Sequence, residues 1–141
     1  MSLSIESGDW ATLKDACTAI RYRVFVGEQQ VPAEEELDSR DNECLHVLLR
    51  VDGNPAGTAR LLPDGHIGRV AVLACHRGKG LGRELMQAII EEARSRGHDS
   101  VALAAQTHAI DFYARLGFIA YGPEFLDAGI PHRNMTLSFK K

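Results

Sequence analysis

The chain has 141 residues, of which 45% are apolar and 25% charged, so it can bury one hydrophobic core and is not a disordered tail. Sixteen Lys and Arg against nineteen Asp and Glu give a net charge of −3, which excludes the strongly basic surface typical of nucleic-acid-binding proteins. No apolar run approaches the ~18 residues of a membrane span, and residues 1–10 lack a signal-peptide pattern. We therefore expect a soluble protein without a membrane partner. The three cysteines show no CxxC spacing, so we expect reduced thiols in the cytoplasm.

The N-terminal third predicts an edge strand, a helix and a polar segment. Residues 3–6 alternate as a strand does, and Asp9 is a typical helix N-cap. Apolar residues then recur at steps of three and four, which predicts a helix that ends near Phe25 or Val26 and buries one face: Trp10, Leu13, Cys17, Ile20 and Val24. Residues 27–43 are polar and irregular, and their acidic run at 34–43 is typical of a solvated surface.

The rest of the chain predicts a strand meander followed by alternating helices and strands. Strands are expected at 44–51, 56–62 and 67–73, separated by turn-forming residues 52–55 and 63–66. A 3.6-residue period from Leu81 predicts a helix that stops at Gly97. A strand at 100–105, a short helix at 109–116 and strands at 118–121 and 135–139 complete the pattern. Without a linker or an internal repeat, residues 1–141 are expected to form one mixed α+β domain with a shared sheet.

The segment between the third meander strand and the long helix is the most informative about chemistry. Residues 76–83, HRGKGLGR, contain three glycines, three Lys or Arg and no acid. Glycines let the backbone turn closely around an anion, and the free amides of a first helical turn attract negative charge. The loop therefore favours a pyrophosphate ligand, although a turn that serves only packing can have the same composition. It is neither a P-loop, since Gly80 follows Lys79, nor a dinucleotide fingerprint, since Arg83 replaces its third glycine.

Two strings in this order resemble a known enzyme family. Val70-Ala71-Val72, followed after four residues by Arg77-Gly78-Lys79-Gly80-Leu81-Gly82, resembles the R-x-x-G-x-G/A signature of the GCN5-related N-acetyltransferases, the GNAT family. Residues 109–118, AIDFYARLGF, resemble the family's short helix with Phe-Tyr before Gly-Phe, and residues 23–29, 105–108 and 129–132 are similar to its ElaA-like subgroup. The resemblance implies the GNAT acyl-CoA N-acyltransferase fold, a mostly antiparallel sheet of six to seven strands flanked by helices, with a V-shaped splay between parallel strands 67–73 and 100–105.

The resemblance also implies acetyl-CoA as the co-substrate, bound in the V. The backbone of residues 70–72 would pair with the pantetheine arm as an added strand, and the amides of residues 78–83 would hold the pyrophosphate. Lys79 and Arg83 would add an attraction that salt screens. The expected cofactor-binding residues are Val70, Ala71, Val72, Arg77, Gly78, Lys79, Gly80, Leu81, Gly82 and Arg83. No metal is expected, because the six histidines show no metal-ligand spacing.

Acetyl transfer to an amine requires an acid and a base. The departing thiolate needs a proton, and Tyr113, which matches the family's Tyr after Phe, is the expected donor because a phenol with a pKa of about 10 is protonated at neutral pH. The alternative is a core tyrosine packed beside Phe112. His132, with an ordinary pKa of ~6.5, is the expected base by resemblance to the glyphosate N-acetyltransferase group, and Glu28 competes for that role. His132 as a turn residue and Glu28 as a loop-fixing residue remain open, while the Val72 amide is a candidate oxyanion donor.

The acceptor is less well defined. Arg60 and Arg69 lie on adjacent predicted strands and could form a fork for a substrate carboxylate or phosphate, or they could face solvent. The acidic run instead favours a cationic amine, and both remain open. We expect an N-acetyltransferase that acts on a small-molecule amine by direct attack in a ternary complex. The alternatives are a non-catalytic acyl-CoA-binding or sensing module and a protein N-terminal or lysine acetyltransferase. A homodimer is compatible with the predicted sheet edges.

Overall fold

The computed structural model describes residues 2–139, which form an antiparallel sheet in the order β1-β2-β3-β4 and a second in the order β5-β7-β6. This confirms the mixed α+β class. The strands are β1 (Leu3–Gly8), β2 (Leu45–Val51), β3 (Asn54–Leu61), β4 (Ile67–Val72), β5 (Ser100–Gln106), β6 (Ile119–Asp127) and β7 (Ile130–Ser138). The helices are α1 (Trp10–Arg21), the π-helix η1 (Tyr22–Glu28), α2 (Ala33–Glu36), α3 (Leu81–Ser95) and α4 (Ile110–Arg115). Short 3-10 turns occupy η2 (Asp41–Glu43), η3 (Ala74–His76) and η4 (Thr107–Ala109).

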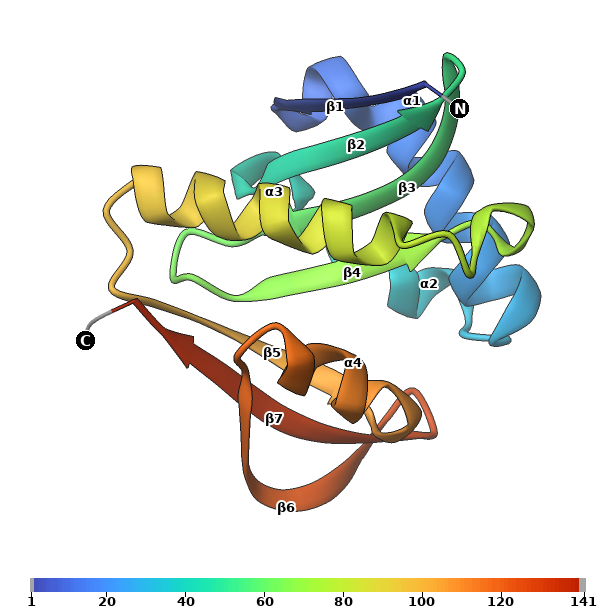
Figure 1. The fold of residues 1–141 in the computed structure, drawn as a ribbon. Coiled ribbons are helices and arrows are strands. Elements are labelled where there is room, and N and C mark those ends of the chain that lie inside the picture. The colour runs from blue at the N-terminus through green and yellow to red at the C-terminus, as the bar shows by residue number, and fades with distance from the viewer. Residues whose placement is uncertain (1, 140–141) are drawn as a thin grey trace.

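The two sheets join at β4 and β5, which run parallel and separate along their length. His66 and Ala102 form an isolated parallel bridge, and the Ala102 amide donates to the Gly65 carbonyl at 3.2 Å. From this junction the strands diverge toward the end of the molecule that carries α2 (Figure 1). The expected V-shaped splay is therefore confirmed, and the shared sheet is divided at this point.

A β-bulge accompanies the divergence. Between the pairs Thr58–Ala71 and Arg60–Gly68, β4 has two residues where β3 has one. Arg69, one of the two, has a φ of 51°, a left-handed conformation that is unusual for a residue other than glycine. Bulges bend a strand and increase its twist, so this one turns the later part of β4 away from β5.

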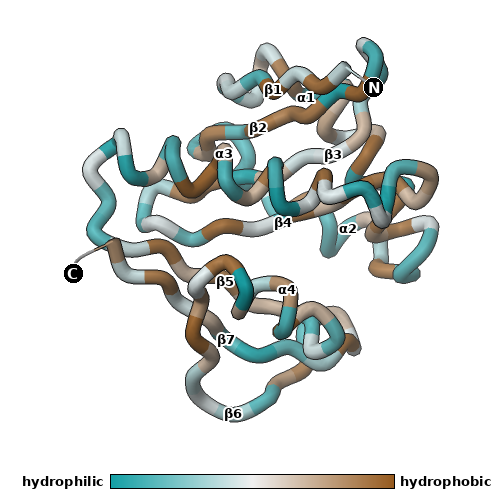
Figure 2. The backbone as a smooth tube through the Cα atoms, in the orientation of Figure 1, coloured by the Kyte–Doolittle hydropathy of each residue, from teal (hydrophilic) through white to brown (hydrophobic). Residues whose placement is uncertain are grey.

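The helices α1 and α3 cover opposite faces of the first sheet. Val47 and Leu49 of β2 pack in the cluster that contains α3, whereas Leu48 between them packs against α1. This follows from the alternation of side chains along a strand. Apolar and polar residues alternate along α3 as its single buried stripe requires (Figure 2). No helix among the described residues is long and apolar enough to cross a membrane.

Three elements differ from the sequence expectations, the first helix and the last two strands. Asp9 caps α1 as predicted, with Thr12 N donating to its carboxylate at 2.9 Å, but the helix continues beyond Val26 as η1. There the Gln29 amide reaches the Val24 carbonyl, a five-residue step that a search for a 3.6-residue period misses. The last two strands are also longer than the predicted 118–121 and 135–139. Gly122 and Pro123 do not end β6, because they lie at a register break within this edge strand.

Candidate active site

A cavity of about 340 Å³ fills the V between β4 and β5. Residues of η1, α4 and the start of β7 close it from the sides. Many of the residues singled out from the sequence line this cavity: Glu28, Val70, Ala71, Val72, Arg77, Tyr113 and His132. The fold thus brings residues that are more than a hundred positions apart in the chain, such as Glu28 and His132, to one place.

The edge of β4 that faces the cavity has backbone groups available to a ligand. The Leu73 amide donates to the Ala56 carbonyl of β3 at 2.8 Å, and successive strand residues direct their N–H and C=O groups to opposite edges. Val72 therefore directs its backbone groups away from β3 and into the V. In agreement, Nε of Arg77 donates to the Val72 carbonyl at 2.9 Å. An extended ligand that carries amides can add to this edge as a strand would.

A second cavity, of about 460 Å³, lies at the N-terminus of α3. Gly80 is the N-cap of the helix and has a left-handed conformation, with a φ of 78°. The Gly80 carbonyl accepts a hydrogen bond from the Glu84 amide. Among the described backbone groups, none accepts a hydrogen bond from the amides of residues 78–83, so these amides can bind an anion. Residues 78 and 80–83 line this cavity, whereas Lys79 is exposed beside it.

The same cavity joins the two sequence motifs. A β-carbon at Gly82 would lie 3.3 Å from Cζ of Phe112, which is tighter than an ordinary contact. Glycine at this position therefore lets Phe112 of α4 pack on the first turn of α3. The contact explains why a glycine-rich loop and a Phe-Tyr helix distant in sequence belong to one site.

Tyr113 lines the V-shaped cavity. Its ring makes edge contacts with Phe112 and Phe118, at centroid distances of 5.0 and 6.0 Å. Burial raises the pKa of its phenol to about 12. The hydroxyl makes no hydrogen bond to another residue of the described chain, so it is both protonated and available to a ligand. Tyr113 is half-buried, so its ring packs in the fold while the residue still lines the cavity.

His132 is held in a defined tautomer. The residue is 8% exposed, and Nδ1 lies 2.7 Å from the Ile130 carbonyl. Since a carbonyl only accepts, Nδ1 carries the proton and Nε2 of the neutral ring carries the lone pair. Phe125 stacks on the ring at a centroid distance of 5.9 Å, and no described residue bonds to Nε2. This is the arrangement that a general base requires.

Glu28 is engaged by Arg77. Nη1 and Nη2 of Arg77 donate to the two carboxylate oxygens of Glu28 at 2.7 and 3.1 Å. The pair connects the end of η1 with the loop that precedes α3, and Arg77 also holds the Val72 carbonyl. A carboxylate committed in this way fits a role in fixing the loop better than a role in removing a proton.

Two glutamines that the sequence analysis did not select bridge the V. Gln29 and Gln106 exchange side-chain hydrogen bonds of 3.3 and 2.8 Å, and Nε2 of His108 lies 2.7 Å from the Gln106 amide oxygen. Gln106 is the register partner of His132 on the neighbouring strand. Gln29 and Gln106 lie in the segments 23–29 and 105–108, which are similar to the ElaA-like subgroup. Two glutamines that pair in the fold have no sequence spacing that would predict the pairing.

The acidic segment is not simply a solvated surface. Glu36 and Asp41 are 5% and 4% exposed, so that interpretation is wrong for these two residues. Arg21, itself buried, donates to both carboxylates, with a distance of 2.8 Å to Asp41. Burial alone would raise the pKa of Asp41, but hydrogen bonds and charges from Arg21 and Arg60 outweigh burial and lower it.

The two arginines expected to bind a substrate anion are engaged within the protein. Arg60 is 4% exposed, donates to Asp38 at 2.9 Å and to Asp41 at 3.0 Å, and lies outside the cavities lined by the described residues. Arg69 donates to the Glu36 carbonyl at 3.0 Å and contacts Asp38. The predicted fork is therefore not open to a ligand at Arg60, and Arg69 alone reaches a cavity.

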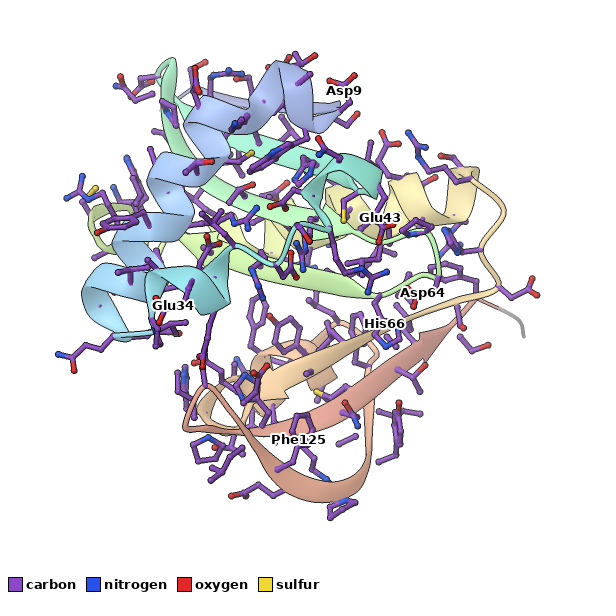
Figure 3. The ribbon with its side chains drawn as sticks, turned by 180° about the vertical axis from the view of Figure 1, so that it is seen from behind. Asp9, Glu34, Glu43, Asp64, His66 and Phe125 are labelled. Carbon is purple, nitrogen blue, oxygen red and sulfur yellow. The ribbon has the colours of Figure 1, made fainter. Side chains whose placement is uncertain are left out.

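A third cavity, of about 440 Å³, adjoins the V on the side of α2. Phe25, Gln106 and His132 line both cavities and so form the passage between them. The outer wall consists of α2 and the turn between β6 and β7. Figure 3 shows Glu34 on α2 at the end of the molecule where this turn lies. The site therefore has one compartment at the α3 N-terminus, one in the V and one beside α2.

Comparison with known proteins agrees with this arrangement. Residues 13–139 match the family model of the acetyltransferase (GNAT) domain. The chain therefore belongs to the GNAT family of acyl-CoA-dependent N-acyltransferases, and it is an acetyltransferase by fold and sequence.

Individual relatives support the same family. The chain is 42% identical over 127 residues to the uncharacterized N-acetyltransferase YjcF of Bacillus subtilis, covering 87% of this chain and 90% of that protein. An acyl-CoA N-acyltransferase from Pseudomonas aeruginosa is 35% identical with a TM-score of 0.86, over 97% of this chain and 100% of the other. Escherichia coli ElaA is 28% identical with a TM-score of 0.87 and the same coverage. The expected resemblance to the ElaA-like subgroup is confirmed.

Proposed function

We propose that the protein transfers an acetyl group from acetyl-CoA to a primary amine of a small molecule, by direct attack in a ternary complex. The observation that carries the proposal is that one cavity holds both an unbonded Tyr113 hydroxyl and an unbonded His132 Nε2 beside the open edge of β4. An acid, a base and a strand edge are the parts that this transfer requires.

The co-substrate would extend over two of the compartments. Its pantetheine arm would pair with the backbone of Val70 to Val72, and its diphosphate would lie against the amides of residues 78–83. The free amides of the loop and the direction of the Val72 backbone groups support this placement. Lys79 and Arg83 would contribute a weaker attraction from the exposed surface.

The chain's residues would then divide the proton transfers. As the amine nitrogen forms its bond to the acyl carbon, Nε2 of His132 would accept the amine proton, and the Val72 amide would donate to the carbonyl oxygen that gains charge. As the carbon–sulfur bond breaks, the Tyr113 hydroxyl would protonate the thiolate. Glu28 would position Arg77 and is the competing base.

A pH profile tests the assignment of the base. We expect His132→Gln to lower kcat by about 100-fold and to abolish the fall in rate on the acidic side, because wild-type activity requires an unprotonated imidazole. The measurement is initial rate of thiol release against pH. His66→Gln, which alters an exposed histidine, should keep the wild-type profile. An acidic limb that persists in His132→Gln would remove this residue from the mechanism and direct attention to Glu28.

A matched pair of glycine variants tests the anion loop. Gly80 and Gly53 both have positive φ, 78° and 84°, and open space where a β-carbon would lie. Alanine at either position strains the backbone by roughly 1–2 kcal/mol. Only Gly80→Ala should weaken acetyl-CoA binding, by about tenfold, because only Gly80 orients the amides at the α3 N-terminus. Calorimetric titration checks this, and equal Kd values for both variants would contradict the loop assignment.

The function as a whole is tested by thiol release from acetyl-CoA in the presence of amines. Release that depends on a small amine supports the proposal. Tight acetyl-CoA binding without release for any amine would favour a sensing module, and release with peptides alone would favour a protein acetyltransferase. We further propose the cytoplasm as its compartment, which the three free cysteines of the described chain support. The homodimer stays a prediction that light scattering can check.

A further inference from the structure

The third cavity is acidic, and it adjoins the candidate base. Five carboxylate residues line it, against one arginine: Glu34, Glu35, Glu36, Asp38 and Asp127, with Arg69. The carboxylates come from two elements that lie far apart in sequence, α2 with the segment after it and the turn between β6 and β7. The fold therefore gathers negative charge around one volume.

Three of these carboxylates have no partner within the described chain. Arg21 neutralises Glu36, and Arg60 neutralises Asp38. The side chains of Glu34, Glu35 and Asp127 are exposed at the cavity wall and make no ion pair with another described residue. Their charges are consequently available to a ligand that enters the cavity.

The single cation of the wall does not cancel this excess. Arg69 directs Nε and Nη2 to the main-chain carbonyls of Glu35 and Glu36, and Nη2 also contacts Asp38 at 3.4 Å. Its charge is shared with carboxylates that already surround it, since Nε lies 3.6 Å from the Glu36 carboxylate. The three carboxylates without an ion pair in the described chain outnumber the one arginine of the wall, which disfavours an anionic acceptor.

A second observation, independent of the charge, identifies the inner end of the cavity as a ligand site. His132 is more than nine-tenths buried, and its Nε2 has no hydrogen-bond partner among the described residues. His132 lines both this cavity and the V, so a ligand that extends from one to the other passes beside its ring. The wall of the same cavity also includes three apolar side chains, those of Phe25, Val31 and Ile130.

From these features we infer that the acceptor is an aliphatic diamine or polyamine. One amine nitrogen would reach His132, the alkyl chain would lie along the apolar wall, and a second, protonated nitrogen would lie among Glu34, Glu35 and Asp127. In the transfer, the reacting nitrogen gives its proton to His132 Nε2 and gains the acyl group, while the distal ammonium keeps its charge. This inference rests on the proposed function, because it names the acceptor of the same reaction.

The decisive experiment compares three acceptors that differ only in the distal group. They are 1,5-diaminopentane, 5-amino-1-pentanol and 5-aminopentanoate, which share the reacting amine and the chain length. With acetyl-CoA saturating, we expect kcat/KM for the diamine to exceed that for the alcohol by roughly tenfold, since exposed charge pairs are individually weak but several act together. The aminocarboxylate should be the poorest of the three. Added salt should reduce the preference for the diamine and leave the alcohol nearly unchanged.

A charge-removing variant locates the preference in the cavity wall. The double variant Glu34→Gln, Glu35→Gln should bring kcat/KM for the diamine within about twofold of that for the alcohol. Glu91→Gln is the matched control, because that carboxylate is 74% exposed on α3. It should retain the full preference.

Binding measurements separate a failure of this inference from a failure of the proposed function. Each acceptor is titrated by calorimetry into the full-length protein saturated with coenzyme A. Equal kcat/KM values, or a preference for the aminocarboxylate, would overturn the diamine assignment and leave the transferase intact. If no acceptor releases thiol, tighter binding of the diamine would uphold the cationic site while the proposed transfer fails. No binding preference would then overturn both.

Discussion

Tyr113→Phe is expected to lower kcat by about 1,000-fold while the Kd for acetyl-CoA changes by less than about twofold. The variant removes one oxygen that makes no hydrogen bond to the described protein and preserves the ring contacts with Phe112 and Phe118. The folded structure therefore loses little, and the effect falls on protonation of the leaving thiolate. Steady-state rates and calorimetric titration of the same preparation measure the two quantities.

Tyr121→Phe provides the control for this prediction, because Tyr121 is 48% exposed on β6. Its kcat should match wild type. The pKa of about 12 adds a further expectation, since an acid acts only below its pKa and Tyr113 should cause no fall in rate below about pH 10. Wild-type turnover by Tyr113→Phe, or a parallel loss of acetyl-CoA affinity, would contradict the assignment of Tyr113 as the acid.

Asp41→Ala is expected to destabilise the protein by about 3–5 kcal/mol, because it leaves Arg21 and Arg60 buried with an incomplete set of partners. The loss should appear as a lower midpoint in urea and as a Tm lower by roughly 10 °C. Asp15→Ala, an exposed position of α1, should stay within about 0.5 kcal/mol of wild type. A loss as small as that of Asp15→Ala would mean that the network around Asp41 contributes little to stability.

The same network predicts how stability depends on acid. The pKa of Asp41 is lower in the folded protein than its ordinary value of 3.8, as is that of Asp38, to which Arg60 donates. A lowered carboxylate pKa gives stability that is complete above about pH 4 and is lost as pH falls toward the folded-state pKa. The free energy of unfolding should therefore fall below about pH 4, and Asp41→Ala should show a shallower fall. Urea titrations at several pH values measure both slopes, and parallel slopes would contradict the assignment.

The sequence predicted those parts of the fold and site that depend on neighbouring residues. The Asp9 cap, the meander and the turn into α3 follow from local pattern and turn chemistry, and the structure contains each of them. The two family motifs predicted which residues line the cofactor side of the V. Their catalytic roles stay proposals until the variants are measured.

The rest of the fold and of the candidate site depends on contacts between residues far apart in the sequence, which no local pattern predicts. Asp41 is buried because Arg21 and Arg60, about twenty positions away on either side, meet it in space. In isolation, a run of acidic residues is most simply read as a surface. Gln29 and Gln106 are 77 positions apart in the sequence and meet only where η1 and β5 both border the V. The acidic run had already favoured a cationic amine, but only the structure shows that Asp127 of the β6–β7 turn joins the carboxylates of α2 at one cavity.

The extra residue in β4 affects the sites proposed for both ligands, acetyl-CoA and the amine acceptor. Deleting Arg69 would restore regular pairing with β3 and leave Ala71 opposite Thr58 and Gly68 opposite Arg60, but it would remove the local bend that turns the later part of β4 away from β5. The same deletion would release the α2 carbonyls that Arg69 holds. The β-bulge at Arg69 thus contributes to the geometry of both the acetyl-CoA site and the acceptor site. A change at this position would therefore alter both sites together.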